Sequence, residues 1–442
     1  MCREIIRRYP HGNIIIFKLR ILEERKEKIY CFNEKNNISL MMDKTLLKKQ
    51  AVQLQLNDIL MQYHFLKEEN EFNDFVETLK IRDSKTLDIT IFVHGDCNFR
   101  CKYCYETFTN INIPAENQNK IIDFIKNKLK DGTFTELVVN WFGGEPLLSW
   151  FRIMKMTDKL KRMCVDLGII YKAGITTNGY LLNSRILNSM LSCDVTTFQI
   201  SIDGNEVSHN AQRVLRDGSG SYATIYQNLR YMQNTDAKFT VLLRFNISAD
   251  NQANIEDFLN HDGKYFRKDS RFQFFFKRIG DWGLGERKID YRVGLARVDA
   301  DIYLCRRAIA LGYNIMNIKF VLNNYQSVCY GRLPNSYSIN IDGNIIKCTT
   351  KMLYDQKNRL GNINDGLIDQ AKNSFWSDNY HYRPQCQDCR FFPLCRGGAC
   401  PIDINGYFEA VCRQRKSDIR KYFDLLITEN DFAITLLDEE QL

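Results

Sequence analysis

The sequence predicts an α/β fold in which helices cover a parallel sheet. Between about residues 87 and 280, six β-rich runs alternate with helical stretches, and repeated strand–helix units are typical of parallel sheets. A chain of 442 residues is too long for one ordinary core, so two or three domains are expected. Hydrophobic residues make up 44% of the chain, which is enough to bury a large interior.

The expected strands are short runs rich in β-branched and aromatic residues. They cover 87–94, 136–142, 170–177, 196–202, 239–247 and 272–277. Helices are expected between them, near 115–130, 149–166, 182–192, 222–234 and 251–260. Because α/β folds place their chemistry in loops after the carboxyl ends of strands, functional residues are expected just after each run.

Residues 1–85 precede this pattern and are predicted to form a small N-terminal α+β module. The runs 13–18 and 28–32 are expected to pair as a hairpin, followed by helices near 43–54 and 71–80. The N-terminus lacks the apolar core of a signal peptide, and no run approaches the roughly 18 apolar residues of a membrane helix. We therefore expect a cytoplasmic protein without a membrane partner.

The formal net charge of +8 is spread along the chain. No block of Lys and Arg with interleaved aromatic residues is present, so nucleic-acid binding is not expected. The fifteen cysteines are distributed unevenly, with three at 97–104 and seven between 329 and 412. In a long chain of this kind, such clusters indicate metal or redox chemistry rather than a disulfide framework.

The first cysteine cluster directly follows the run 87–94. Cys97, Cys101 and Cys104 form a C-x3-C-x2-C pattern. Three thiolates can hold three irons of a [4Fe-4S] cube and leave the fourth iron open to a small-molecule ligand. A zinc site, or three unrelated cysteines, is the alternative interpretation.

The triplet, with Tyr103 before its third cysteine, resembles the signature of radical S-adenosylmethionine (SAM) enzymes. The resemblance implies a partial (β/α)6 TIM-like barrel over 86–315. It implies that SAM chelates the open iron through its amino and carboxylate groups, and that Tyr103 lies against the adenine. A reductant such as flavodoxin or ferredoxin would then supply the electron that releases a 5′-deoxyadenosyl radical, which abstracts hydrogen from the substrate.

Polar turns at the ends of the following strands match the SAM-binding positions of that family. The turn at 143–145 resembles the motif that holds the amino group of SAM, and its glycines allow close approach to the backbone. Asn178 and Ser201 resemble the ribose- and carboxylate-binding positions, and Arg213 resembles an arginine that binds the SAM carboxylate. Taken singly, the turns could be purely structural and Arg213 a surface residue. The resemblance assigns SAM binding to Tyr103, Gly143, Gly144, Glu145, Asn178, Ser201 and Arg213.

The second group of cysteines lies in the region 316–442. The stretch 338–348 is predicted to be a hairpin that turns at Asp342-Gly343 and presents Cys348. The segment 386–412 alone could be a zinc ribbon. Alongside the first triplet it resembles a SPASM domain with two auxiliary [4Fe-4S] clusters. The resemblance assigns Cys386, Cys389, Cys395 and Cys412 to the outer cluster, and Cys329, Cys348 and Cys400 to the inner cluster.

Two features depart from the SPASM pattern. Four residues separate Cys395 from Cys400 where the family usually has three, and the intervening glycines can absorb the extra residue. Residues 321–328 contain no cysteine to serve as a fourth inner ligand. Cys305, another side chain or an open iron remain alternatives for that position.

SPASM enzymes act mostly on peptides or proteins. The resemblance therefore implies an oxidoreductase that modifies a ribosomally made precursor peptide (a RiPP maturase) and forms a thioether or carbon–carbon crosslink. The module 1–85 is similar in shape to a leader-peptide recognition element, and a plain extension is the alternative.

Three other functions are considered. One is an anaerobic sulfatase-type formylglycine maturase. That family places an aspartate after the cysteine that corresponds to Cys348, where this chain has Thr349. Another is a non-catalytic iron–sulfur scaffold, which would not need the SAM motifs. The third is an enzyme that acts on a small molecule and forms 5′-deoxyadenosine without a leader-bearing peptide. The sequence identifies no catalytic acid or base.

Overall fold

The computed structural model describes sixteen stretches of the chain, and all structural statements below refer to them. They are 4–8, 14–19, 21–25, 28–33, 38–43, 66–67, 71–109, 111–280, 299–322, 329–350, 356–377, 384–387, 389, 391–397, 404–429 and 434–437. The chain forms two compact units. The barrel unit comprises Arg82–Asn317 and Tyr330–Asp378, and the second unit comprises Met1–Ile81, Ile318–Cys329 and Asn379–Leu442.

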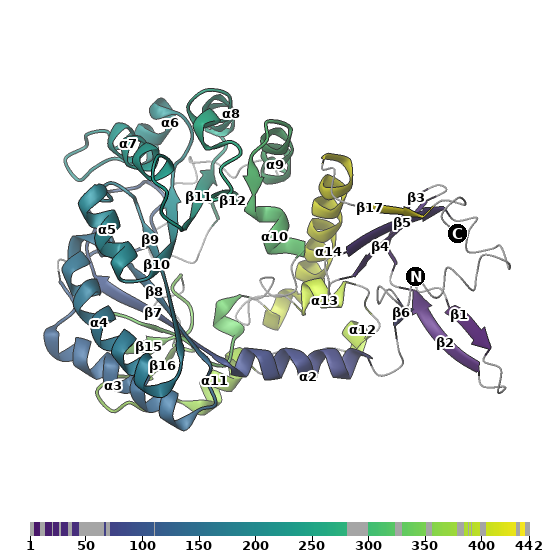
Figure 1. The fold of residues 1–442 in the computed structure, drawn as a ribbon, viewed down its shortest axis with the longest axis horizontal. Coiled ribbons are helices and arrows are strands. Elements are labelled where there is room, and N and C mark those ends of the chain that lie inside the picture. Colours follow the sequence, from purple (N-terminus) through teal and green to yellow (C-terminus); the bar gives the residue numbers. More distant parts are fainter. Residues whose placement is uncertain are drawn as a thin grey trace. The chain divides into compact units, whose positions relative to one another are not determined.

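Six parallel strands in chain order form the centre of the barrel unit (Figure 1). They are β7 (Thr86–His94), β8 (Glu136–Gly143), β9 (Ile170–Thr177), β10 (Val195–Ser201), β11 (Thr240–Ile247) and β12 (Phe272–Arg278). The helices of this region are α3 (Ala115–Asp131), α4 (Trp150–Leu167), α5 (Ser184–Ser192), α6 (Glu206–Gln212), α7 (Tyr222–Gln233) and α8 (Gln252–Asn260). The expected strands and helices are confirmed, and α6 is an additional helix.

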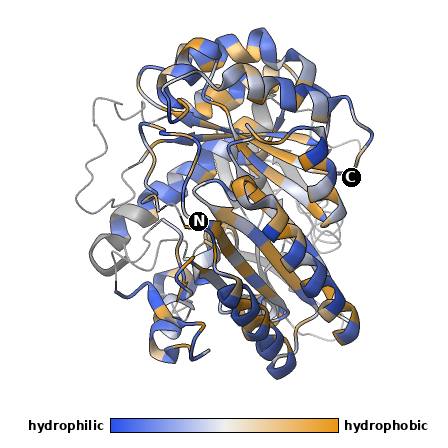
Figure 2. Ribbon diagram, turned by 90° about the vertical axis from the view of Figure 1, so that its left-hand side faces the viewer, coloured by the Kyte–Doolittle hydropathy of each residue, from blue (hydrophilic) through white to orange (hydrophobic). Residues whose placement is uncertain are grey.

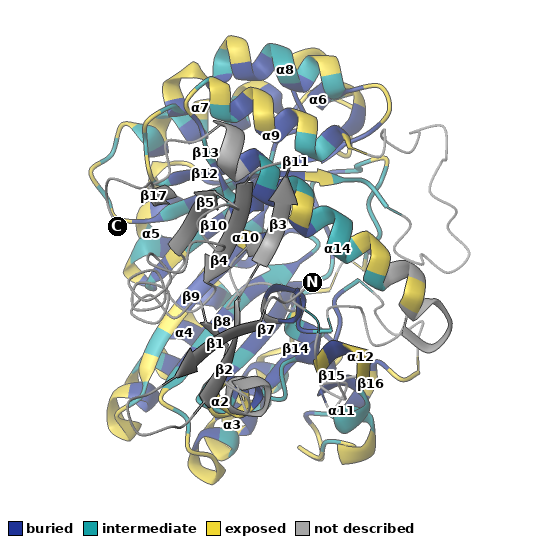
Figure 3. Ribbon diagram, turned by 90° about the vertical axis from the view of Figure 1, so that its right-hand side faces the viewer, coloured by how far each residue is buried: buried dark blue, intermediate teal, exposed yellow. Residues whose placement is uncertain are grey.

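Burial patterns explain why these segments form strands and helices. On β8, Leu137, Val139 and Trp141 are fully buried, whereas the residues between them are partly exposed. This period of two is the pattern of a strand with two different faces. Helix α3 instead buries Ile121 and Ile125 at a spacing of four, which defines one apolar stripe. Figure 2 shows apolar strands beside helices with hydrophilic outer faces, and Figure 3 shows the exposed outer faces of α7 and α8.

The sheet continues beyond the six central strands on both sides. Strand β13 (Asn314–Ile315) pairs with β12, and β14 (Ser336–Ile339) pairs with β7 in parallel. Strands β15 (Asn344–Ile346) and β16 (Arg359–Asn362) add antiparallel neighbours. The expected hairpin between β14 and β15 is confirmed, with Gly343 at a positive φ of 80°.

The remaining elements of the barrel unit and its border are short. They are η2 (Pro146–Ser149), η3 (Asp262–Phe266), α9 (Ala300–Ala310), α10 (Met316–Leu322), η5 (Tyr330–Arg332) and α11 (Gln370–Ser377). Because β14 to β16 extend the barrel sheet, the compact units do not follow the expected division at 85/86 and 315/316. The functional division into three domains stays a prediction.

The second unit contains two small sheets. One consists of β1 (Glu4–Arg8), β2 (Ile14–Leu19) and β6 (Leu66–Lys67), and the other of β3 (Ile21–Arg25), β4 (Lys28–Asn33), β5 (Ile38–Asp43) and β17 (Ile434–Leu437). Its helices are α2 (Glu71–Ser84, which runs past the border of the unit), α12 (Pro384–Gln387), α13 (Phe392–Cys395) and α14 (Ile404–Glu429). No helix among the described residues has the length and apolar character needed to cross a membrane.

The predicted hairpin between 13–18 and 28–32 is wrong. Strand β2 pairs with β1 and β6, whereas β4 pairs with β3 and β5. Only two residues separate β3 from β4, so their pairing closes a much shorter loop than the predicted one. The helix predicted near 71–80 is confirmed as α2. The one near 43–54 falls, apart from Asp43 in β5, outside the described residues.

Candidate active site

A cavity lies at the carboxyl ends of the central strands, with a volume of about 920 Å3 that includes space open to solvent. The loop after β7 and the ends of β8 to β11 supply most of its wall. The lining residues include Cys97, Phe99, Cys101, Tyr103, Cys104, Tyr105, Glu106, Phe142, Gly143, Gly144, Thr176, Thr177, Asn178, Gln199, Ser201, Arg213, Arg244 and Asn246. The cavity thus brings together the first cysteine triplet and six of the seven residues assigned to SAM.

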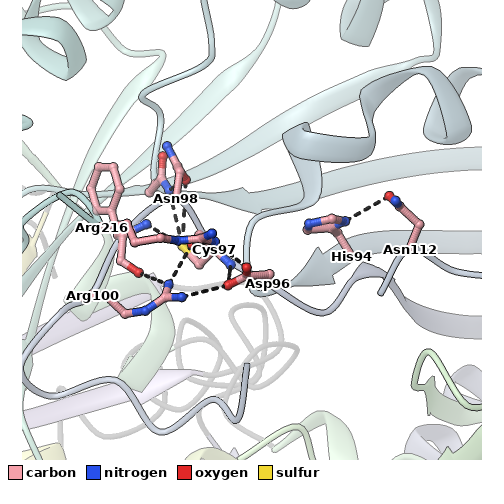
Figure 4. A network of polar contacts seen from close by, with 9 residues as sticks. His94, Asp96, Cys97, Asn98, Arg100, Asn112 and Arg216 are labelled. Carbon is pink, nitrogen blue, oxygen red and sulfur yellow. Dashed lines mark hydrogen bonds and ion pairs between the residues drawn. The ribbon is translucent and has the colours of Figure 1, made fainter. Parts of the chain in front are cut away.

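The cysteine loop is held by an acidic residue at its start (Figure 4). Asp96 accepts hydrogen bonds from the Cys97 N–H at 2.7 Å and from Arg100 at 3.1 Å, and it forms a close ion pair with Arg216. Arg100 also donates to the Cys97 carbonyl at 2.7 Å. Partial burial opposes ionisation of Asp96, but the Cys97 N–H and the Arg216 and Arg100 charges outweigh it and lower its pKa. The protein itself therefore fixes the conformation of this loop.

The three thiols of the triplet line the cavity, and their surroundings affect their ionisation. Burial, reinforced by the Glu145 charge, raises the pKa of Cys97 to about 12, and burial also raises the pKa of Cys104 to about 12. Iron would have to displace these protons. Two N–H groups point at the Cys97 sulfur, from Phe99 at 3.3 Å and from Asn178 at 3.6 Å, and they favour a thiolate there.

The glycines after β8 allow the chain to pass close to the cysteine loop. Gly143 has a φ of 132°, and a Cβ there would lie 2.3 Å from the His94 carbonyl oxygen. A Cβ on Gly144 would lie 2.4 Å from the Asp96 carbonyl oxygen. The Gly144 N–H also donates to the His94 carbonyl at 3.0 Å. Both glycines are thus required by backbone packing as well as lining the cavity.

Glu145 is fully buried and is the one SAM-assigned residue that does not line the cavity. Its carboxylate accepts hydrogen bonds from the Leu147 N–H at 2.9 Å, the Thr177 hydroxyl at 2.7 Å and the Asn178 N–H at 2.7 Å. Burial raises its pKa, although the Asn178 N–H opposes the shift. Glu145 therefore positions Asn178, and a direct contact with SAM stays a prediction.

A buried polar network holds Tyr103 at the cavity wall. Its hydroxyl donates a short hydrogen bond to Asp203 and accepts from Arg213 at 2.6 Å and from Asn246 at 2.9 Å. Asn246 also donates to Asp203 through its backbone and side-chain N–H groups, both at 3.1 Å. Arg213 is only 6% exposed, so the surface interpretation of this residue is wrong.

Asp203 and Asn246 were not assigned from the sequence. Their positions in the chain could have indicated them. Asp203 follows β10 two residues after Ser201, and Asn246 lies near the end of β11, the strand that pairs with β10. Burial raises the pKa of Asp203, although the Arg213 charge and the Tyr103 hydrogen bond oppose the shift. His209 supports the same turn, since its Nδ1 accepts the Asp203 N–H at 3.2 Å.

The outer-cluster cysteines lie in the second unit. Cys386 is buried with Val76 and Phe392, and Cys389 and Cys412 pack against this group. Cys395 is buried at the end of α13. Three of the four assigned residues thus gather in one place, and the ligand set itself stays a prediction.

The inner-cluster assignment is not tested by the described residues. Cys329 is exposed in the second unit, whereas Cys348 is buried in the barrel unit. Cys400 lies outside the described residues. Cys305 is fully buried on α9. Its suggested role as fourth ligand stays open.

Comparisons with known proteins find a matching family model, related sequences and similar solved structures. Residues 91–261 match the model of the family described as the radical SAM superfamily. The cysteine-type anaerobic sulfatase-maturating enzyme of Clostridium perfringens (strain 13 / Type A) is 23% identical over 327 residues, which are 68% of this chain and 85% of that protein.

A second relative and a solved structure add to this. The radical SAM cyclopropyl synthase TigE of Paramaledivibacter caminithermalis is 27% identical over 162 residues, 33% of this chain and 32% of that protein. The structure of native anSMEcpe with bound AdoMet has the same fold, with a TM-score of 0.58 at 18% identity. That alignment covers 78% of this chain and 100% of the other.

Proposed function

Because this chain is a radical SAM enzyme and is similar over two thirds of its length to a sulfatase-maturating enzyme, which acts on a protein, we propose that it matures a ribosomally made precursor peptide by forming a thioether or carbon–carbon crosslink. One observation carries the proposal: the triplet, the glycine turn and the strand-end polar residues line a single cavity. A non-catalytic scaffold would have no need for that convergence.

The residues of this cavity fit a cluster and SAM. Cys97, Cys101 and Cys104 would hold the cluster, and the turn at 143–145 would accept the SAM amino group. When bound, the cluster and SAM supply a carbon-centred radical strong enough to remove hydrogen from an unactivated carbon. The chain supplies binding, orientation and exclusion of competing hydrogen donors.

The polar network prepares the carboxylate end of the proposed SAM site. The Arg213 guanidinium donates to the Tyr103 hydroxyl at 2.6 Å, and that hydroxyl in turn donates to Asp203, which restrains the position of Arg213. The Arg213 Nε is buried and has no partner among the described residues. This unsatisfied donor, together with the Ser201 hydroxyl at the cavity wall, supports binding of a carboxylate there.

A formylglycine maturase is the second candidate, favoured by the similarity to the sulfatase-maturating enzyme over two thirds of the chain. Thr349 stands where that family carries the proposed aspartate base. Its hydroxyl lies 2.7 Å from the Tyr330 hydroxyl, and its N–H donates to the same oxygen at 2.9 Å. Neutral hydroxyl groups do not replace a carboxylate base near pH 7, which supports crosslinking over formylglycine formation.

Co-expression with the peptide encoded beside this gene tests the proposal. Mass spectrometry should find a peptide that has lost two hydrogens and contains a crosslinked pair of residues. Cys389→Ala should retain some SAM cleavage but lose this product, and Cys164→Ala, a buried cysteine outside every assigned site, should leave both intact. An aldehyde in the peptide would identify a formylglycine maturase instead. An unmodified peptide without 5′-deoxyadenosine would indicate a scaffold.

A further inference from the structure

Two arginines, Arg213 and Arg244, line the cavity, and they differ in their hydrogen bonds. Arg213 is buried within the network of Tyr103 and Asp203. Arg244 is only partly buried on β11. Its Nε donates to the Asn246 side-chain oxygen at 2.9 Å. Among the described residues its two terminal NH2 groups make no hydrogen bond or ion pair. Arg244 therefore presents uncommitted charge to the cavity.

The strand fixes the direction of this side chain. Leu243 and Phe245, its neighbours on β11, are fully buried in the apolar core, so Arg244 projects from the opposite face, into the barrel. In register it lies between Ser201 of β10 and Phe275 of β12. Its backbone is thus set by two neighbouring strands rather than by a loop.

The Asn246 side chain holds the Arg244 guanidinium through its Nε. The Asn246 amide donates to Tyr103 and Asp203, so its oxygen is left to accept from the Arg244 Nε. This arrangement orients the planar guanidinium and leaves its outer edge for a ligand. A partly buried arginine with an open edge is suited to bind a carboxylate through two parallel hydrogen bonds.

We propose that Arg244 binds a carboxylate of the peptide substrate and so selects an acidic side chain, or a free C-terminus, near the reacting carbon. This inference rests on the proposed function. The SAM carboxylate is already assigned to Ser201 and Arg213, which leaves Arg244 for the substrate. Arg244 lines the same cavity as Tyr105 and the cysteine triplet.

Ligand-observed NMR on the anaerobically reconstituted, SAM-bound enzyme tests the inference without requiring turnover. Three capped tripeptides serve as probes: acetyl-Gly-Glu-Gly-amide, acetyl-Gly-Gln-Gly with a free C-terminus, and the neutral acetyl-Gly-Gln-Gly-amide. We expect one of the two charged probes to bind at least about tenfold more tightly than the neutral one. The charged probe that binds identifies the source of the carboxylate.

Variants locate the contact. Arg244→Gln should remove the preference for the charged probe, and Arg244→Lys should keep part of it. Arg162→Gln, which alters an exposed arginine paired with Asp158, should keep all of it. Iron content and the melting temperature of each variant establish that it is folded and loaded.

Three results would overturn the inference. They are equal binding of all probes to the wild type, unchanged preference in Arg244→Gln, or a tenfold loss of SAM affinity in Arg244→Gln. The last would mean that Arg244 holds the carboxylate of SAM. Failure of the proposed function is distinguishable, because it would appear as a wild-type enzyme that forms no crosslinked peptide on co-expression, whatever the probes do.

Discussion

Replacing Tyr103 by Phe tests the buried network beside the cavity. The substitution keeps the ring and removes only the hydroxyl. That hydroxyl donates to Asp203 and accepts from Arg213 at 2.6 Å and Asn246 at 2.9 Å. Each buried group that loses a partner costs about 1–3 kcal/mol. Because Asp203 and Asn246 keep other bonds to each other, we expect the free energy of unfolding to fall by about 3 kcal/mol.

The assay is urea denaturation of the anaerobically reconstituted enzyme, combined with SAM affinity. The affinity of Tyr103→Phe should fall because Arg213 is no longer held in place. Tyr180→Phe is the matched control, since its ring packs edge-on against Phe99 at 5.8 Å and its hydroxyl makes no hydrogen bond among the described residues. The control should change stability by less than about 0.5 kcal/mol. A Tyr103→Phe enzyme with wild-type stability and SAM affinity would refute the reasoning.

Three further predictions concern other positions of the barrel unit. Burial raises the pKa of Asp88 from 3.8 to about 6; its charge therefore destabilises the folded state above pH 6, and this penalty disappears below pH 4. Asp88→Asn should be up to about 3 kcal/mol more stable than wild type at pH 7.5, and an equal gain at pH 4 in urea denaturation would contradict this. Gly144→Ala should lose iron at the triplet because its Cβ meets the Asp96 carbonyl. Gly168→Ala, which has open space around it but a left-handed φ of 66°, should lose about 1 kcal/mol of stability and yet retain iron by metal analysis. Glu145→Ala should weaken SAM binding at least about tenfold by freeing three buried donors, and unchanged affinity in equilibrium binding would count against its positioning role.

Local patterns explain why the barrel could be predicted. The alternation on β8 and the four-residue spacing on α3 depend only on neighbouring residues, so the sequence displays them directly. Strand pairing in the second unit depends on which segments meet. Strand β3 was not expected because three of its five residues, Glu23, Glu24 and Arg25, are charged, which is more typical of a turn than of a strand. Without β3, the nearest available partner for β4 was β2, and the predicted hairpin was wrong.

The residues of the candidate site also fall into two groups, those that a local sequence pattern indicates and those that only the folded structure brings together. The cysteine triplet and the glycine turn are contiguous in sequence and could be assigned to a family. The Asp203 carboxylate and the Asn246 amide gain their roles from hydrogen bonds to Tyr103, which precedes them by 100 and 143 residues. No spacing rule connects such positions. For the same reason the sequence did not reveal the bonds of Glu145 to Leu147, Thr177 and Asn178, and its predicted contact with SAM stays a prediction.

The central claim is that three protein thiolates at 97–104 hold a cluster with one iron left for SAM. Its most direct measurement is 5′-deoxyadenosine formation from SAM and reductant by anaerobically reconstituted enzyme, with iron and zinc quantified in the same sample. The account predicts iron-dependent cleavage by the wild type and none by Cys101→Ala. Full cleavage by Cys101→Ala, or a zinc-filled triplet in the active protein, would contradict it.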